Sequence, residues 1–319
     1  MIPLRELAEA NQRLHGRVKV TPLQEDPSTG WLLKWENRQI TGSFKLRGAM
    51  NKVLSLPPGD VEAGLVCASA GNHGQGVAVA GQAVGSRVVV FASENAVPSK
   101  VAAMQALGAE VTLVKGGYEA AEAAGKEFAR QSGMVWVSPY NDVQVICGQA
   151  SLGYEVLEQM AGRMLDELYL PVGGGGLAVG VGTVMKNFSP TTRVIGVQSE
   201  ASAYMHQFFQ HGSQAGVVEG ESLADGLAGA VEEGSVTLEL IRQNVDEMVL
   251  VTEEEISRAI AFAWRRYGER IEGSAAVALA AARRIHQPGQ LAAVLISGGN
   301  IQPATHEKLL VQFPGEGLS

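Results

Sequence analysis

Lys45 has the surroundings of a lysine that does covalent chemistry. It follows a Gly-Ser turn and an aromatic residue in the stretch Thr41-Gly42-Ser43-Phe44-Lys45, at the expected start of a helix. A lysine by itself is usually a solvated surface charge, so the neighbouring motifs decide its interpretation. Three other turns rich in glycine and polar residues stand beside expected strands or helices: Ser69 to Gly74, Gly173 to Gly176, and Ser297 to Asn300. The four stretches together indicate one shared anionic ligand.

The glycine tetrad Gly173-Gly174-Gly175-Gly176 is typical of an anion site. It follows an expected strand and opens a helix, so consecutive N–H groups converge on one anion and the helix dipole adds to the attraction. The tetrad also matches the pattern G-x-G-x-x-A through Ala178, so a dinucleotide site stays open. The next expected strand ends at Gln198, where a dinucleotide site prefers an acidic residue. Glu200 lies slightly beyond that position and keeps the option open.

The stretch Ser69-Ala70-Gly71-Asn72-His73-Gly74 carries groups that bind a carboxylate. It follows an expected strand and leads into a helix, where a hydroxyl, an amide and unpaired N–H groups are available. The same pattern is also typical of an ordinary polar N-cap, with His73 as a structural loop histidine. Ser297, after the last expected strand, has a hydroxyl that can donate a hydrogen bond to a ring nitrogen or accept one from it.

The elements that must position these turns alternate between strand and helix. Apolar runs predict strands at 31–36, 64–68, 87–91, 110–114, 134–137, 167–172, 193–197, 247–251 and 291–296. Helices are expected at 4–15, 73–84, 98–107, 118–131 and from about 143 to 160, and 212–235 is interpreted as a loop or lid. Continuous apolar strands that alternate with helices are typical of parallel sheets covered on both faces. We therefore expect an α/β fold with two open, largely parallel twisted sheets and ligands beyond the carboxyl ends of their strands.

The composition narrows the class of function. The chain has 319 residues, 46% hydrophobic and 18% charged, which suits a globular protein with a large core in two domains. A net charge of −8 without a basic tract argues against nucleic acid or an anionic membrane as partner. No signal peptide or membrane-spanning window is found, so a cytoplasmic protein is expected. Cys67 and Cys147 lack a C-x-x-C partner, which predicts buried, reduced thiols.

As a set, the motifs resemble those of the pyridoxal-phosphate (PLP) enzymes of the tryptophan-synthase-β structural class, fold type II. They look most like the threonine/serine dehydratase and serine racemase family, and the resemblance covers essentially the whole chain. It also includes the motifs 34–39, 139–142, Gly148-Gln149, Ala224-Asp225-Gly226 and Glu272-Gly273-Ser274. The resemblance implies a cofactor between a large domain, 1–52 plus 141–319, and a small domain, 53–140. Biosynthetic threonine dehydratases carry a C-terminal regulatory domain, but residues 301–319 are too few for one, so none is expected. Dimers are common in the family, so a homodimer is expected.

The resemblance also implies a role for each motif, position by position. Lys45 is then the Schiff-base lysine and general base, Phe44 lies against the pyridine ring, and Asn72 binds the ring hydroxyl. The phosphate is then held by Gly173, Gly174, Gly175 and Gly176, and the pyridine nitrogen faces Ser297. The substrate carboxylate is bound by Ser69, Ala70, Gly71, Asn72 and His73.

The activity implied is PLP-dependent α,β-elimination of L-threonine or L-serine, an amino-acid substrate that would give 2-oxobutanoate or pyruvate plus ammonia. Ala70 stands where serine racemases carry a second acid–base serine, which favours elimination over racemisation. Gln198 and Tyr204 stand where racemase-like members bind a divalent cation through carboxylates, so no required metal is expected unless Glu200 rebuilds the site. Ser138 stands at a position that is usually histidine in the family, and the sequence offers no account of that change.

Other functions stay open at this point. A dehydratase of another 3-hydroxy amino acid (3-hydroxyaspartate or phenylserine), a serine racemase and a cysteine-synthase-like β-replacement enzyme all fit the motifs. A nicotinamide oxidoreductase or a non-catalytic binding module leaves the Ser-Phe-Lys stretch unexplained. The runs Glu253-Glu254-Glu255 and Arg265-Arg266 are interpreted as solvated helix residues, the acids being favourable near a helix N-terminus.

Overall fold

A computed structural model describes residues 2–317, whose contacts group them into two compact units. We call residues 20–43 and 152–317 the larger unit, and residues 2–19 and 44–151 the smaller unit. This grouping joins 44–52 to the smaller unit because helix α2 (Lys45–Leu54) packs along helix α4 (Asn72–Val84). The domain boundaries implied by the family, 1–52 plus 141–319 and 53–140, stay a prediction.

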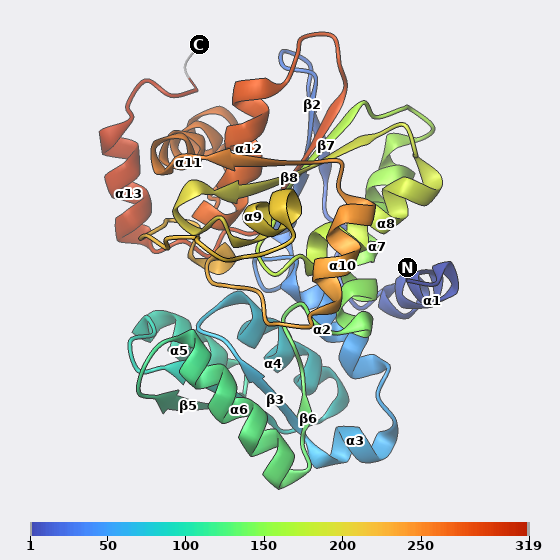
Figure 1. Ribbon diagram of the computed structural model, residues 1–319, viewed down its shortest axis with the longest axis vertical. Coiled ribbons are helices and arrows are strands. Elements are labelled where there is room, and N and C mark those ends of the chain that lie inside the picture. The colour runs from blue at the N-terminus through green and yellow to red at the C-terminus, as the bar shows by residue number, and fades with distance from the viewer. Residues whose placement is uncertain (1, 318–319) are drawn as a thin grey trace. The chain divides into compact units, whose positions relative to one another are not determined.

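The larger unit is built on a six-stranded sheet (Figure 1). The strand order is β1-β2-β10-β7-β8-β9, and each neighbouring pair is parallel except β1 and β2. The strands are β1 (Leu23–Asp26), β2 (Trp31–Trp35), β7 (Glu167–Pro171), β8 (Arg193–Ser199), β9 (Glu247–Val251) and β10 (Ala292–Ile296). Because parallel strands end at one edge of a sheet, the segments that follow β7, β8 and β10 share that edge.

Helices cover the sheet of the larger unit. They are α8 (Gly176–Phe188), α9 (Tyr204–His211), α10 (Val236–Asn244), α11 (Glu253–Tyr267), α12 (Gly273–Ile285) and α13 (Pro303–Gln312), with short 3-10 turns at Glu36–Arg38, Glu200–Ser202 and Asp225–Leu227. The alanine-rich helix α12 lies along β7, β8, β9 and β10 and is buried from Gly273 to Ala282, because small side chains let it approach the sheet closely. Helix α11 packs on α12, and Thr252 and Glu255 form a capping box at its start.

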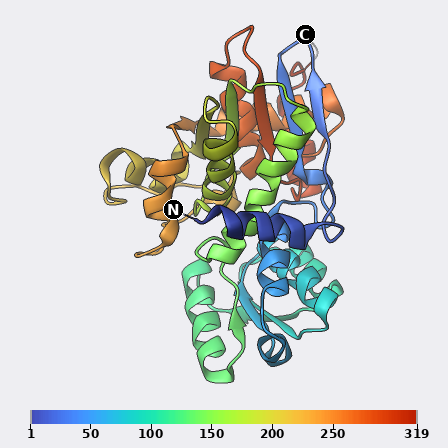
Figure 2. The same cartoon turned by 90° about the vertical axis from the view of Figure 1, so that its right-hand side faces the viewer.

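The smaller unit contains a four-stranded parallel sheet. Its strand order is β5-β4-β3-β6, formed by β3 (Leu65–Ala68), β4 (Val88–Ser93), β5 (Glu110–Val114) and β6 (Val135–Trp136). Its helices are α1 (Leu4–Leu14), α2, α3 (Pro58–Ala63), α4, α5 (Pro98–Ala106) and α6 (Tyr118–Ser132). Helix α1, dark blue in Figure 2, packs against α2. Helix α7 (Val143–Met160) begins in this unit and ends in the larger one.

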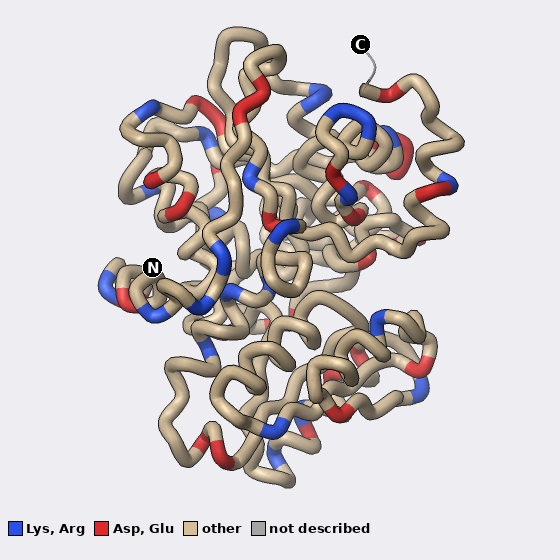
Figure 3. Tube along the Cα trace, turned by 180° about the vertical axis from the view of Figure 1, so that it is seen from behind, with Lys and Arg blue, Asp and Glu red and all other residues tan. Residues whose placement is uncertain are grey.

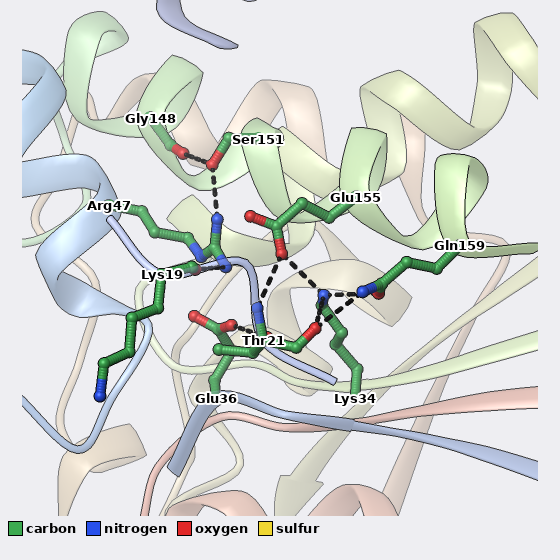
Figure 4. Close-up of polar contacts among 9 residues, drawn as sticks. All are labelled: Lys19, Thr21, Lys34, Glu36, Arg47, Gly148, Ser151, Glu155 and Gln159. Atoms are coloured by element: carbon green, nitrogen blue, oxygen red, sulfur yellow. Dashed lines mark hydrogen bonds and ion pairs between the residues drawn. The ribbon is translucent and has the colours of Figure 1, made fainter. Parts of the chain in front are cut away.

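A polar network lies inside the larger unit (Figure 4). The ammonium group of Lys34, a fully buried residue of β2, donates to Glu155 Oε2 at 2.7 Å, Gln159 Oε1 at 2.8 Å and the carbonyl of Thr21 at 2.7 Å. The amide of Gln159 also donates to the Thr21 carbonyl, at 2.9 Å. A buried ammonium is tolerated only when its donors are satisfied, and here three acceptors surround it.

The fold confirms the expected α/β class with two largely parallel sheets. The segment 212–235 contains one 3-10 turn and is otherwise irregular, as expected of a loop. Cys67 and Cys147 are buried free thiols, and burial raises the pKa of Cys147 to about 12. Basic and acidic residues are interspersed along the trace (Figure 3). Within residues 2–317, no helix is long and apolar enough to span a membrane.

Candidate active site

Lys45 is the first residue of helix α2, and its amine lies among groups of the smaller unit. The Nζ atom donates a hydrogen bond to the carbonyl of Pro139 at 3.1 Å and lies 5.3 Å from the centre of the Phe44 ring. Both side chains are half-buried. A Cβ built on Gly76 of α4 would lie 3.2 Å from the backbone of Lys45, so the glycine allows the two helices to approach closely. The lysine is therefore held on a rigid, packed helix start.

The Ser69–Gly74 turn lies in the same unit and opens helix α4. Ser69 follows β3, and its hydroxyl accepts a hydrogen bond from the N–H of Gly71 at 3.0 Å. Gly71 is the N-cap residue of α4 and has no side chain that could cap the helix. The N–H groups of the first helical turn therefore receive no side-chain hydrogen bond from the N-cap. Asn72 is half-buried as the first helical residue, and Ala70 is exposed. This local geometry suits an anion.

His73 is a neutral imidazole inside this turn. Its Nε2 atom lies 2.9 Å from the carbonyl of Val137, which can only accept, so Nε2 carries the proton. The other ring nitrogen, Nδ1, is buried and has no hydrogen-bond partner among residues 2–317. Burial, together with the charge of Lys45, lowers the pKa of His73 to about 3. The charge of Lys45 thus disfavours protonation of His73.

The glycine tetrad forms a cradle in the larger unit. It follows β7, and helix α8 begins at Gly176 with Gly175 as an N-cap that has no side chain to offer. Gly175 has a φ of +86°, which other residues rarely adopt. A Cβ on Gly173 would lie 3.0 Å from the Cα of Leu227, so a side chain there would press on backbone. The uncapped helix start therefore leaves its N–H groups to a ligand.

Ser297 follows β10, the neighbour of β7 in the sheet, and is 2% exposed. Its turn is tied to the stretch before Lys45: Ser43 forms an antiparallel bridge with Gly298, and the N–H of Gly299 donates to the carbonyl of Gly42 at 2.9 Å. The hydroxyl of Ser43 is fully buried without a hydrogen-bond partner among the described residues. Sequence analysis gave Ser43 no role, and only the unpaired hydroxyl draws attention to it.

The structure thus assembles the predicted residues in two groups. Phe44, Lys45 and the Ser69–His73 turn lie together in the smaller unit, and the tetrad and Ser297 follow adjacent strands of the larger unit. Sequence analysis missed the Pro139 carbonyl that accepts from Lys45, because no local signal marks it. It also left Ser138 unexplained. The hydroxyl of Ser138 is buried and accepts from the N–H of Asn141 at 3.0 Å, which caps the turn beside Pro139.

One of the positions expected to lack a metal has another hydrogen-bond partner. Gln198 is 1% exposed, and its side-chain carbonyl accepts from the N–H of His206 at 3.0 Å. Glu200 is exposed, and Tyr204 begins helix α9. No group of three or more His, Cys, Asp or Glu residues with metal-site geometry occurs in the part of the chain from 2 to 317. That no metal is required stays a prediction.

The residues present fit a phosphorylated aldehyde cofactor. The tetrad offers backbone N–H donors in a space that side chains would fill, and Lys45 offers a half-buried primary amine. Each feature matches a part of pyridoxal phosphate: an anion cradle suits its phosphate and an amine suits its carbonyl.

Comparisons with known proteins agree with this chemistry. The family model described as "Pyridoxal-phosphate dependent enzyme" matches residues 14–298. The L-threonine ammonia-lyase of Thermotoga maritima is 40% identical over 309 residues, which is 94% of this chain and 76% of that protein. Among solved structures, threonine deaminase isoform 2 from Solanum lycopersicum has a TM-score of 0.89 at 29% identity and covers 98% of this chain and 93% of its own.

Serine racemase from Dictyostelium discoideum has a TM-score of 0.86 at 32% identity, covering 94% of this chain and 99% of its own. The family match extends from Leu14, the last residue of helix α1, to Gly298, and so includes Lys45, the Ser69–Gly74 turn, the glycine tetrad and Ser297. The chain therefore belongs to the pyridoxal-phosphate dependent enzymes, and within them to the family of threonine/serine dehydratases and serine racemases.

Proposed function

We propose that this protein deaminates L-threonine to 2-oxobutanoate and L-serine to pyruvate. Water is eliminated across the α- and β-carbons, and a water molecule then hydrolyses the resulting enamine to the keto acid and ammonia, so that ammonia is the only net loss. The observation that carries the proposal is the 40% identity to an L-threonine ammonia-lyase over 94% of the chain. The threonine deaminase fold at a TM-score of 0.89 supports it.

Lys45 is the residue that carries the reaction in this proposal. When bound, pyridoxal phosphate supplies an electron sink for the substrate's α-carbon. Lys45 holds the cofactor at rest, and its amine takes the proton from the α-carbon during the reaction. The contact to the Pro139 carbonyl orients the amine, and the nearby His73 is neutral, so it adds no second positive charge.

The remaining residues bind and orient in this proposal. The side chains of Ser69 and Asn72, with the backbone N–H groups of Ala70, Gly71, Asn72 and His73, receive the substrate carboxylate. His73 takes part through its backbone because its ring N–H is donated to the Val137 carbonyl. Phe44 lies against the pyridine ring and Asn72 bonds the ring hydroxyl. Gly173, Gly174, Gly175 and Gly176 hold the phosphate through their N–H groups.

Two residues decide which reaction follows. Ser297 places a neutral hydroxyl at the ring nitrogen, which does not hold that nitrogen protonated as a carboxylate would. This weaker electron withdrawal favours prompt loss of the β-hydroxyl over transamination. Ala70 has a methyl group that cannot exchange protons, so we expect little racemisation.

We further propose a cytoplasmic homodimer that needs no divalent cation. Gln198 supports the proposal that no cation is needed. Its neutral amide stands where racemase-like members have a carboxylate ligand, and its oxygen accepts a hydrogen bond from the N–H of His206. A serine racemase is the second candidate, favoured by the Dictyostelium discoideum structure at 32% identity. A dehydratase of 3-hydroxyaspartate or phenylserine also fits the motifs.

One experiment separates these functions. Keto-acid and ammonia release is measured from L-threonine, L-serine, D-serine and 3-hydroxyaspartate, with and without EDTA, alongside the D-serine formed from L-serine. Turnover of L-threonine and L-serine that ignores EDTA supports the proposal. Preference for 3-hydroxyaspartate, rapid formation of D-serine, or loss of activity in EDTA contradicts it.

A further inference from the structure

Glu253 connects three parts of the larger unit through one carboxylate. It is the first residue of helix α11 and is half-buried. Its Oε1 atom accepts hydrogen bonds from the hydroxyls of Ser199 and Ser222, each at 2.6 Å. Its Oε2 atom accepts from the N–H of Leu223 at 2.7 Å. Three donors from two distant segments thus converge on one side chain.

This environment differs from the one expected for the three glutamates that begin the helix. Glu254 is exposed and pairs with Arg258 one turn later, as a solvated helix residue does. Glu255 closes the capping box with Thr252. Glu253 instead turns to the segment 222–223, so the interpretation as a solvated residue is wrong for this position.

The two serine hydroxyls transmit this contact to the backbone. Each hydroxyl gives its only proton to Glu253 and accepts from an N–H two residues further on. Ser199 accepts from Ala201 at 3.1 Å, and Ser222 accepts from Ala224 at 3.0 Å. The carboxylate therefore fixes the end of β8 and the beginning of the segment 222–227 together.

The segment 222–227 is packed against the start of α12. A Cβ on Gly273 would lie 2.0 Å from the Leu223 carbonyl oxygen, so the two backbones are in direct contact. The N–H of Gly226 donates to the hydroxyl of Ser274 at 3.0 Å. The segment thus has one anchor at each end, Glu253 at 222–223 and Ser274 at 226.

The same segment forms a wall of the glycine cradle. A Cβ on Gly173 would lie 3.0 Å from the Cα of Leu227 and 3.4 Å from its carbonyl oxygen. The position of Leu227 therefore limits where the first residue of the tetrad can lie. Because Glu253 anchors the beginning of this segment, its carboxylate acts on the tetrad without touching it.

We propose that Glu253 is a positioning residue for cofactor binding: it holds the segment 222–227 against Gly173 and so keeps the tetrad's N–H groups in place for the phosphate. The inference rests on the proposed role of the tetrad. It adds a residue that does not contact the cofactor and whose side chain is needed for tight binding.

The test compares Glu253→Ala and Glu253→Gln with Glu254→Ala as the matched control on the same helical turn. The dissociation constant of pyridoxal phosphate is measured by absorbance titration of the apoprotein, and the bound phosphate is observed by 31P NMR. Loss of hydrogen bonds to a charged acceptor predicts at least about a tenfold weaker affinity and a shifted, broadened 31P signal for Glu253→Ala.

The conservative variant distinguishes positioning from a general structural effect. Glutamine can accept from Leu223 N–H and donate its amide protons to both serine hydroxyls, so Glu253→Gln should stay within about threefold of wild type. Glu254→Ala should match wild type. Wild-type affinity and an unchanged 31P signal in Glu253→Ala would overturn the proposal, as would equal losses in the Ala and Gln variants.

Two further readouts keep the test decisive. If Glu253→Ala does not fold by circular dichroism, Ser222→Ala takes its place, with an expected weakening of about threefold and wild-type affinity as the contradicting result. Wild-type apoprotein that takes up no pyridoxal phosphate refutes the proposed function itself. Uptake by wild type with equal uptake by the variants refutes only the role of Glu253.

Discussion

Replacing Lys34 by methionine should destabilise the larger unit strongly. Lys34 is fully buried and its ammonium group lies 2.7 Å from Glu155 Oε2, and Glu155 is 9% exposed in its side chain (Figure 4). Methionine matches the length of the lysine stem but removes the charge, so the buried Glu155 carboxylate loses its ion pair with Lys34.

The expected magnitude follows from the loss of that buried ion pair. Removing one partner of a buried ion pair typically costs about 3–5 kcal/mol, whereas replacing both partners with apolar residues is often neutral. Lys34→Met should therefore lower the free energy of unfolding by about 3–5 kcal/mol. The double variant Lys34→Met/Glu155→Met should recover most of that loss.

The assay is equilibrium urea unfolding of the apoprotein followed by far-UV circular dichroism, with thermal unfolding beside it. For a unit of this size, the loss corresponds to a fall in Tm of roughly 6–20 °C. The control is Arg163→Met, which breaks an exposed pair with Glu25 in the same unit and should change stability by at most about 1 kcal/mol.

Two results would refute this reasoning. If Lys34→Met lies within about 1 kcal/mol of wild type, the pair behaves like a solvated surface pair. If the double variant is as unstable as the single one, the loss of stability does not come from the broken ion pair with Glu155 but from packing or from the contacts to Gln159 and the Thr21 carbonyl.

The remaining predictions concern pH and packing. Burial raises the pKa of Asp26, but hydrogen bonds from Arg266, Ser28 and Tyr267 outweigh it and hold the pKa well below its usual range. A depressed pKa stabilises the fold above the unfolded value near about 3.9, and this stabilisation is lost as pH falls through the folded value. Asp26→Asn should thus cost about 1.5–3 kcal/mol at pH 7 in urea unfolding, with the difference from wild type shrinking below about pH 4; a pH-independent difference contradicts this. Ser43→Ala removes a buried, unpaired hydroxyl and should leave the apoprotein's Tm unchanged or raise it by the equivalent of about 1 kcal/mol, whereas a fall of several degrees would reveal a missed partner. Gly148→Ala places a methyl group 2.5 Å from the Arg47 carbonyl oxygen and 2.6 Å from the Gly48 Cα, so a loss of at least about 2 kcal/mol is expected, against at most about 0.5 kcal/mol for Gly59→Ala, which meets nothing within 4 Å.

The fold could be predicted largely from the sequence because its strands are short apolar runs that glycine-bearing turns separate. Strands β3, β4, β5, β7, β8, β9 and β10 each lie within two residues of the expected bounds. Strand β1 was expected only as extended chain after Pro22, because its four residues, Leu-Gln-Glu-Asp, carry no apolar periodicity. It forms by antiparallel pairing with β2, which local sequence does not show.

The chemistry of the candidate site was also predictable, but its supporting contacts were not. Lys45, the Ser69–Gly74 turn and the tetrad are local motifs, so their residue types reveal them. The bond from Lys45 to Pro139 joins residues 94 positions apart, and Arg266 binds Asp26 across 240 positions. Arg266 is exposed, as expected, but its ion pair with Asp26 was not predicted, because pairing over such separations depends on the folded sheet.

The most direct test of the central claim is to find which lysine carries the cofactor. Protein loaded with pyridoxal phosphate is reduced with borohydride, digested, and mapped by mass spectrometry. The account predicts that the reduced cofactor is attached to the peptide containing Lys45 and that the Lys45→Ala variant gives no labelled peptide. Labelling of a different lysine, or no uptake of pyridoxal phosphate by the wild-type protein, would contradict it.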